Sequence, residues 1–140
     1  MSKVVGGCLC GKIRYTSTAE PVMTAVCHCK NCQKASGAGG SVNAMIKSAD
    51  FKLLQGKPKR YTAVADSGRT LHRHFCGDCG SPIYSQREQT PENMVVRAGT
   101  FDNAGDMKIS HNIWTKSKRP WAHVDPASTQ HPSQPDAPAR

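Results

Sequence analysis

Hydrophobic residues in this chain occur in short runs that are separated by glycine, proline, aspartate and serine. Several runs alternate between apolar and polar residues, which is the pattern of strands with one buried face. In residues 69–75, for example, Leu71 and Arg73 fall on one side of an extended chain and the intervening histidines on the other. The pattern predicts strands over residues 12–16, 22–26, 41–46, 51–54, 60–65, 69–75, 83–85, 94–98 and 108–114.

Helical periodicity is nearly absent from the sequence. Residues 30–35 form the one short stretch with a helical pattern, and we find no longer run with a 3.6-residue period, no heptads and no solenoid-length repeat. We therefore predict a mostly β fold of about eight or nine short strands with short helical turns.

The last part of the sequence has a different composition. Residues 125–140 contain four of the nine prolines and otherwise no apolar residue larger than alanine. Such a segment buries too little apolar surface to compensate for the entropy lost on ordering. We expect one folded domain over residues 1–124 and a disordered, proline-rich tail over residues 125–140.

The apolar composition is lean for a core that stabilises itself. Hydrophobic residues make up 37% and aromatic residues 6% of the 140 residues, so we expect another source of stability. The chain has seven cysteines, and this odd number excludes a fully paired disulfide framework. Clustered thiols that are not paired in disulfides more often bind metal.

The cysteines fall into three groups with the spacing of metal ligands. They form a C-x-C, a C-x-C-x-x-C and a C-x-x-C followed by glycine: Cys8 and Cys10; Cys27, Cys29 and Cys32; Cys76 and Cys79. The triplet is close enough in sequence to bind one ion alone, and the two pairs can combine into a second site. Structural zinc takes four protein ligands, whereas catalytic zinc keeps an open position beside three. The sequence therefore predicts two zinc ions per chain, one of which ties distant segments together.

Two other interpretations of the cysteines are weaker. Free cysteine is often a small buried hydrophobe, but three separate groups at ligand spacing argue against that explanation. The Cys76–Cys79 pair also has the form of a thioredoxin-like dithiol, but it lacks the βαβ context of that motif.

Three segments resemble the motifs of a known family. They are GCLCGKIRY at residues 7–15, CHCKNCQKASG at residues 27–37 and FCGDCGSP at residues 75–82. In this order they resemble the glutathione-dependent formaldehyde-activating enzyme family, which also includes centromere protein V. The segments GTFD at residues 99–102, HNIW at residues 111–114 and PW at residues 120–121 are similar to its weaker C-terminal signatures.

The resemblance implies a fold, two metal sites and an activity. The fold is a small zinc-stapled β-tent of packed antiparallel sheets. The resemblance assigns a structural zinc to Cys8, Cys10, Cys76 and Cys79, and a catalytic zinc to Cys27, Cys29 and Cys32. The activity is the condensation of formaldehyde with glutathione to S-hydroxymethylglutathione, which is a carbon–sulfur lyase reaction written in reverse.

One segment departs from the family pattern. Family members often carry an apolar or aromatic residue that lines the pocket after the second motif. This chain has Gly39 and Gly40 there, and we expect these glycines either to open the pocket or to loosen it.

The formal net charge of +9 indicates an anionic partner. Glutathione carries two carboxylates, and cationic side chains near the second zinc would orient it. The candidates are Lys34, Arg73, Lys116 and Lys118. His28 lies between two ligands, so alternation points it away from the metal and favours a hydrogen-bonding role. Trp114 and Trp121 are expected in the core.

The alternative is a zinc-stapled binding module without chemistry. Its basic surface would bind nucleic acid or an acidic partner through a cluster of cationic residues: Lys47, Lys52, Lys57, Lys59 and Arg60. The sequence shows no interleaving of aromatic and basic residues for base stacking, and a three-cysteine site would have no purpose in such a module. We therefore favour the enzyme, with a small thiol and an aldehyde as its partners rather than nucleic acid.

The N-terminal residues contain no apolar segment typical of a signal peptide, and no apolar run approaches the roughly 20 residues that span a bilayer. The expected location is the cytoplasm, where thiols stay reduced.

Overall fold

The computed structural model describes residues 3–65 and 68–135 of the chain. These residues form eleven strands: β1 (Val4–Gly7), β2 (Arg14–Ser17), β3 (Met23–Cys27), β4 (Ser41–Lys47), β5 (Phe51–Gln55), β6 (Lys59–Val64), β7 (Thr70–Phe75), β8 (Pro82–Arg87), β9 (Asn93–Arg97), β10 (His111–Ile113) and β11 (Thr129–Gln130). The helical segments are α1 (Lys30–Ser36) and three 3-10 turns: Ser48–Asp50, Ala98–Thr100 and Thr115–Ser117.

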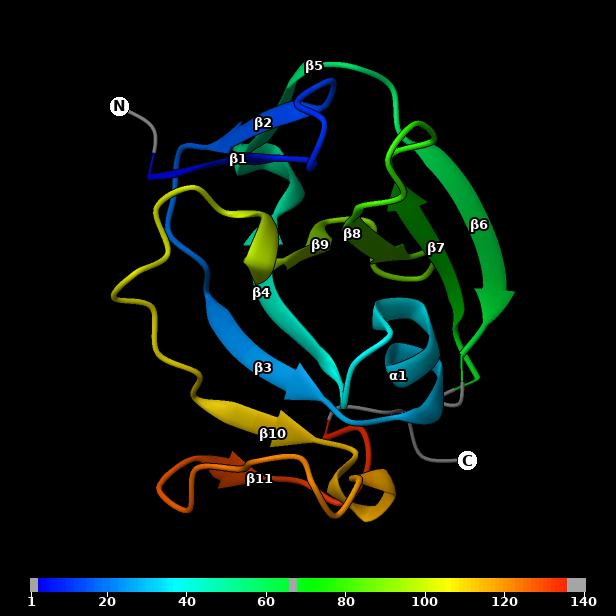
Figure 1. Ribbon diagram of the computed structural model, residues 1–140, viewed down its shortest axis with the longest axis vertical. Coiled ribbons are helices and arrows are strands. Elements are labelled where there is room, and N and C mark those ends of the chain that lie inside the picture. The colour runs from blue at the N-terminus through cyan, green and yellow to red at the C-terminus, as the bar shows by residue number, and fades with distance from the viewer. Residues whose placement is uncertain (1–2, 66–67, 136–140) are drawn as a thin grey trace.

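The strands form two sheets (Figure 1). A three-stranded sheet has the order β1-β2-β5, and an eight-stranded sheet has the order β11-β10-β3-β4-β9-β8-β7-β6. Figure 1 shows the larger sheet curling so that α1 lies between β4 and β7. The predicted mostly β fold is confirmed, with one difference in strand direction. The sheets are antiparallel except at β10, which runs parallel to both β3 and β11.

All nine predicted strands overlap strands of the structure, and the predicted helix coincides with α1. The sequence pattern missed β1 and β11. Gly6 and Gly7 end the apolar run of β1, yet this strand requires small residues. A Cβ atom on Gly6 would lie 2.3 Å from the Thr100 carbonyl oxygen and 2.5 Å from the Tyr15 hydroxyl.

The structure differs from the expected disordered tail. Residues 125–135 are ordered against β10: the Thr129 amide donates to the Ser110 carbonyl at 3.0 Å, and the His131 amide donates to the Asn112 carbonyl at 2.9 Å. Backbone pairing of this kind needs no apolar side chain, so an argument from composition overlooks it. The folded part of the chain therefore extends beyond Val124. Residues 136–140 of the expected tail lie outside the described residues.

The main core lies between the two sheets and centres on Tyr15, which is fully buried. Its ring stacks on Phe51 with a centroid distance of 5.2 Å. The Thr100 hydroxyl donates to the Arg97 carbonyl at 2.7 Å, so the Tyr15 hydroxyl is the donor in its 2.6 Å hydrogen bond to Thr100. Tyr15 thus joins the small sheet to the end of β9.

The longest helix in the described part of the chain is α1, with seven residues, and no helix there is long and apolar enough to cross a bilayer.

Tyr15→Ala should lower the free energy of unfolding by about 3–5 kcal/mol, because it leaves a ring-sized cavity between the sheets. Tyr61→Ala is the matched control. Tyr61 lies on β6 and is 61% exposed, so its loss should cost less than about 1 kcal/mol. Urea unfolding of both variants measures the difference, and equal losses would contradict this core.

Candidate functional site

Four cysteines gather where the small sheet meets the large one. Cys8 and Cys10 follow β1, and Cys76 and Cys79 lie in the turn between β7 and β8. Their sulfur atoms all lie within 4.8 Å of one another. The Cys8–Cys10 sulfur distance is 3.6 Å and the Cys10–Cys76 distance is 3.8 Å. The two pairs, which are far apart in sequence, therefore form one group.

A glycine with positive φ closes each of the two turns. Gly11 has a φ of 82° and Gly80 a φ of 80°, a region that other residues enter at a cost. The Gly80 amide donates to the Cys76 carbonyl at 2.8 Å, and the Ile13 amide donates to the Cys8 sulfur at 3.3 Å. The glycine after Cys79 thus closes a tight turn, which brings the thiols of Cys76 and Cys79 to the other pair.

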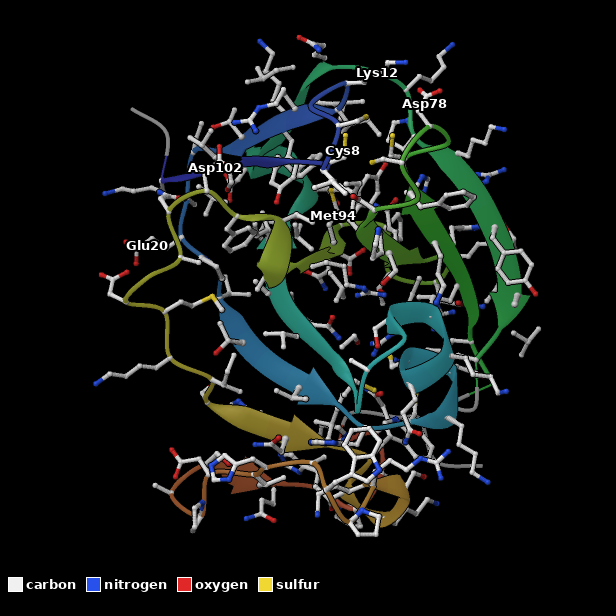
Figure 2. The ribbon with its side chains drawn as sticks, in the orientation of Figure 1. Cys8, Lys12, Glu20, Asp78, Met94 and Asp102 are labelled. Atoms are coloured by element: carbon white, nitrogen blue, oxygen red, sulfur yellow. The ribbon has the colours of Figure 1, made fainter. Side chains whose placement is uncertain are left out.

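The four-cysteine group fits a tetrahedral zinc ion. Zinc–sulfur bonds of about 2.3 Å place the sulfurs of a tetrahedral site about 3.8 Å apart, close to the distances found here. A hydrogen bond from the Ser81 hydroxyl lowers the pKa of Cys79 to about 5, which favours the thiolate form. Lys12 and Asp78 form an ion pair of 3.6 Å at the outer surface. Figure 2 shows both residues near Cys8.

The second thiol group is formed at the junction of β3 and α1. Cys27 ends β3, Cys29 is the N-cap of α1, and Cys32 lies in its first turn. The Cys32 amide donates to the Cys29 sulfur at 3.3 Å, and Gly37 ends the helix with a φ of 71°. This short helix brings three buried thiols within 4.8 Å of one another.

Hydrogen bonds within this second group favour ionisation of one thiol. Those from Cys27 and Cys29 lower the pKa of Cys32 to about 2, whereas hydrogen bonds with Cys29 and Cys32 raise the pKa of Cys27. Soft thiolates suit zinc, and three of them form the ligand set of a site that keeps one open position.

His28 fixes the loop that carries the second thiol group. Its side chain is 1% exposed, and its Nε2 lies 2.8 Å from the Asn112 Oδ1 of β10. The Gln33 side-chain amide donates to the His28 carbonyl at 2.8 Å. The predicted role of His28 as a hydrogen-bonding neighbour of the ligands is confirmed, and it is not among the clustered metal-ligand candidates.

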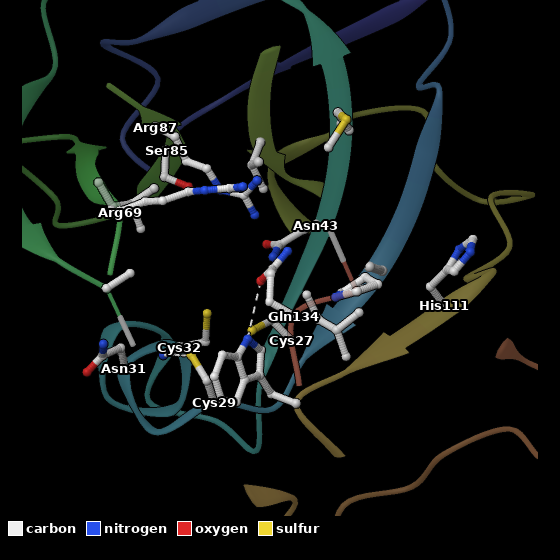
Figure 3. Close-up of a pocket in the computed structure, with 18 of the residues that line it drawn as sticks. Cys27, Cys29, Asn31, Cys32, Asn43, Arg69, Ser85, Arg87, His111 and Gln134 are labelled. Carbon is white, nitrogen blue, oxygen red and sulfur yellow. Dashed lines mark hydrogen bonds between the residues drawn. The ribbon is translucent and has the colours of Figure 1, made fainter. Parts of the chain in front are cut away.

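The second thiol group opens onto a cavity of about 440 Å³ on one face of the large sheet (Figure 3). Side chains point to this face from every second strand position. Met23, Ala25 and Cys27 line the cavity from β3, and Val95 and Arg97 line it from β9. The alternating pattern of the sequence thus gives one wall of the cavity.

Four arginines line the same cavity: Arg69, Arg73, Arg87 and Arg97. Figure 3 shows Arg69 and Arg87 across the cavity from the labelled cysteines. Arg97 is only 9% exposed and donates to the Asn43 side-chain oxygen at 2.7 Å. Burial lowers its pKa, and the Cys32 thiolate acts in the opposite direction.

Two of these guanidinium groups stand out electrostatically. Arg97 forms no ion pair with a carboxylate among the described residues. The Arg73 Nε is buried and has no hydrogen-bond partner within residues 3–65 and 68–135. The cavity therefore offers an anion both positive charge and an unused donor.

The four residues predicted to contact glutathione differ in their position relative to the cavity. Arg73 lines the cavity, whereas Lys34, Lys116 and Lys118 do not. Lys116 lies over the Trp114 ring at 4.9 Å, and Lys118 donates to the Ala122 carbonyl at 3.4 Å. Sequence reasoning missed Arg69, Arg87 and Arg97. The signal was available for Arg97, since it lies in a predicted strand on the same face as Val95.

The glycines after α1 do not open the cavity, because neither Gly39 nor Gly40 lines it. They instead permit close packing. A Cβ atom would meet the Trp121 ring at 2.9 Å from Gly39, and the Cys27 carbonyl oxygen at 2.6 Å from Gly40. The core prediction was wrong for Trp121, which is 71% exposed. Trp114 is partly buried, packs against the buried cluster that contains the three thiols, and lines the cavity.

Known proteins resemble this chain in sequence. A protein of Halomonas elongata, named provisionally as a glutathione-dependent formaldehyde-activating enzyme, is 30% identical over 103 residues, which cover 70% of this chain and 65% of that protein. A Sordaria macrospora protein with the same provisional name is 30% identical over 79 residues, which cover 56% of this chain and 32% of that protein. The chain thus spans less than two thirds of either relative.

A solved structure resembles the fold. The crystal structure of a Rhodobacter sphaeroides protein covers 75% of this chain and 96% of its own, with a TM-score of 0.57 and 18% identity. The family model described as glutathione-dependent formaldehyde-activating enzyme matches residues 3–117, a range that contains all seven cysteines. The chain therefore belongs to the glutathione-dependent formaldehyde-activating enzyme family.

Proposed function

We propose that this protein reversibly joins a small aldehyde, formaldehyde, to a thiol such as glutathione. It would be a carbon–sulfur lyase of the S-(hydroxymethyl)glutathione synthase type. The observation that carries the proposal is a buried group of three thiols that opens onto a cavity lined by four arginines. Family membership supports the same activity.

The two thiol groups would hold one zinc ion each. Cys8, Cys10, Cys76 and Cys79 would bind the structural ion, and Cys27, Cys29 and Cys32 the second. An ion with three thiolate ligands supplies an open position where an incoming thiol can bind and ionise at neutral pH.

The arginines would bind and orient the thiol substrate. Glutathione has two carboxylates, and guanidinium groups bind carboxylates through paired, charge-assisted hydrogen bonds. Arg73 offers its unused Nε, and Asn43 fixes the direction of Arg97. With its carboxylates on these groups, the substrate would extend its sulfur toward Cys27, Cys29 and Cys32.

The reaction balances without a further reactant. The thiol sulfur forms a bond to the carbonyl carbon of formaldehyde, the carbon–oxygen π bond breaks, and the thiol proton ends on the new hydroxyl oxygen. Holding both reactants in one cavity supplies the usual advantage of proximity.

The binding-module alternative is less well supported by the site. Its cationic cluster on β4, β5, β6 and their connections does not line the cavity, so a basic surface there would leave both the arginines and the three thiols without a role.

The metal assignment predicts two zinc ions per chain by native mass spectrometry. Cys29→Ser should leave a folded protein with one ion, because its group closes only a short local loop. Cys8→Ser should lose stability on the order of several kcal/mol, because its group joins distant segments. Circular dichroism melting and zinc content compare the two variants. Unfolding of Cys29→Ser with tolerance of Cys8→Ser would reverse the two roles.

The activity is measured by NMR exchange between ¹³C-formaldehyde and glutathione, where the protein should accelerate exchange above the spontaneous rate. Arg73→Met should raise the KM for glutathione about tenfold or more, because a charge-assisted hydrogen bond is lost, and should change kcat little. Lys52→Met, on the outer strand β5, is the charge-matched control and should behave like the wild type. A zinc-loaded protein that leaves the exchange rate at its spontaneous value would refute the proposal.

A further inference from the structure

Part of the cavity wall comes from residues that follow the family domain. The family match ends at residue 117. His131, Gln134 and Pro135 nevertheless line the same cavity as the three thiols and the arginines. The segment over residues 128–135 is called the C-terminal wall below.

The C-terminal wall is held against β10 by its backbone. Besides the parallel pairing of β11 with β10, the Thr115 amide donates to the His131 carbonyl at 3.1 Å. The His131 ring stacks on His111 of β10, with centroids 5.8 Å apart. The wall therefore has a defined position in the cavity.

Side-chain contacts connect the wall to the loop that carries the thiols. Asn112 donates through its side-chain nitrogen to the Ser128 hydroxyl at 2.8 Å, and its oxygen contacts His28 at 2.8 Å. Since His28 lies between Cys27 and Cys29, one side chain of β10 positions both the thiol loop and the wall.

Trp114 lines the cavity and is hydrogen-bonded to the C-terminal wall. Its indole N–H donates to the Gln134 side-chain oxygen at 3.2 Å, as the dashed line in Figure 3 shows. Trp114 has a φ of 58°, and no other described residue except glycine has a positive φ. A bulky residue in this conformation is strained, and such strain persists where the surroundings fix it, commonly at binding sites.

We propose that the C-terminal wall determines thiol specificity, with Gln134 as a positioning residue that holds the Trp114 ring against the peptide part of a glutathione-like thiol. This inference rests on the proposed function. The arginines would take the carboxylates of the substrate, the three thiols would face its sulfur, and the wall would cover the uncharged backbone between them. A thiol without a peptide part would gain nothing from the wall.

The test compares glutathione with 2-mercaptoethanol as the thiol. Gln134→Ala should raise the KM for glutathione about five- to tenfold, with kcat unchanged and with 2-mercaptoethanol kinetics unchanged. Trp114→Phe, which removes the indole donor, should have a similar effect. The double variant should be no worse than Gln134→Ala alone, because both single changes remove the hydrogen bond between Trp114 and Gln134. Gln89→Ala, exposed in the turn between β8 and β9 and absent from the cavity lining, is the control.

Calorimetric binding of S-methylglutathione to the zinc-loaded protein gives a readout that is independent of turnover. Weaker binding by Gln134→Ala without any thiol–aldehyde turnover in the wild type would support the wall and refute the proposed function. Normal turnover with an unchanged glutathione KM in Gln134→Ala would refute the wall alone. Equal losses with both thiols would also refute it, and a wild type that neither binds the analogue nor turns over glutathione would refute both.

Discussion

The crowding of thiols into two groups is the constraint on which the rest of this structure depends. Sulfurs 3.6–3.8 Å apart would repel one another strongly as thiolates unless a cation lay among them. With a zinc ion bound, the four-sulfur group would join the strand β1 to the turn between β7 and β8, and so would fix the small sheet on the large one. A chain with 37% hydrophobic residues gains from such a link, because its core buries little aromatic surface apart from the Tyr15 cluster.

The same link leaves the opposite face of the large sheet available for a cavity. Tyr15 and its neighbours pack on one face, and the three-thiol group and the arginines occupy the other. Thr100 connects the two, because it accepts from Tyr15 and donates to the backbone of Arg97. Packing between the sheets thus supports the end of β9, where the buried Arg97 lies beside the three thiols. A change that weakens the core between the sheets should therefore also disturb the site.

The sequence predicts the secondary-structure elements of this fold better than it predicts the tertiary contacts between them. Nine strands follow from short apolar or alternating runs, and the two thiol groups follow from ligand spacing, because both signals are local. The convergence of Arg73 and Arg97 depends on strand order within the sheet, which no local pattern contains. The ordering of residues 125–135 depends on backbone hydrogen bonds, to which composition is insensitive. The role of Gly39 and Gly40 was predicted wrongly because it depends on contacts with Trp121 and β3, which no local sequence pattern contains.

The central claim is that seven thiols form one closed and one open zinc site. X-ray absorption at the zinc edge of the zinc-loaded protein tests it most directly, because it counts sulfur ligands around the ion. The account predicts an average of between three and four sulfurs per zinc, since seven thiols serve two ions, and a rise to four when glutathione is added. Four sulfurs per zinc both before and after glutathione, or a shell of oxygen and nitrogen alone, would contradict it.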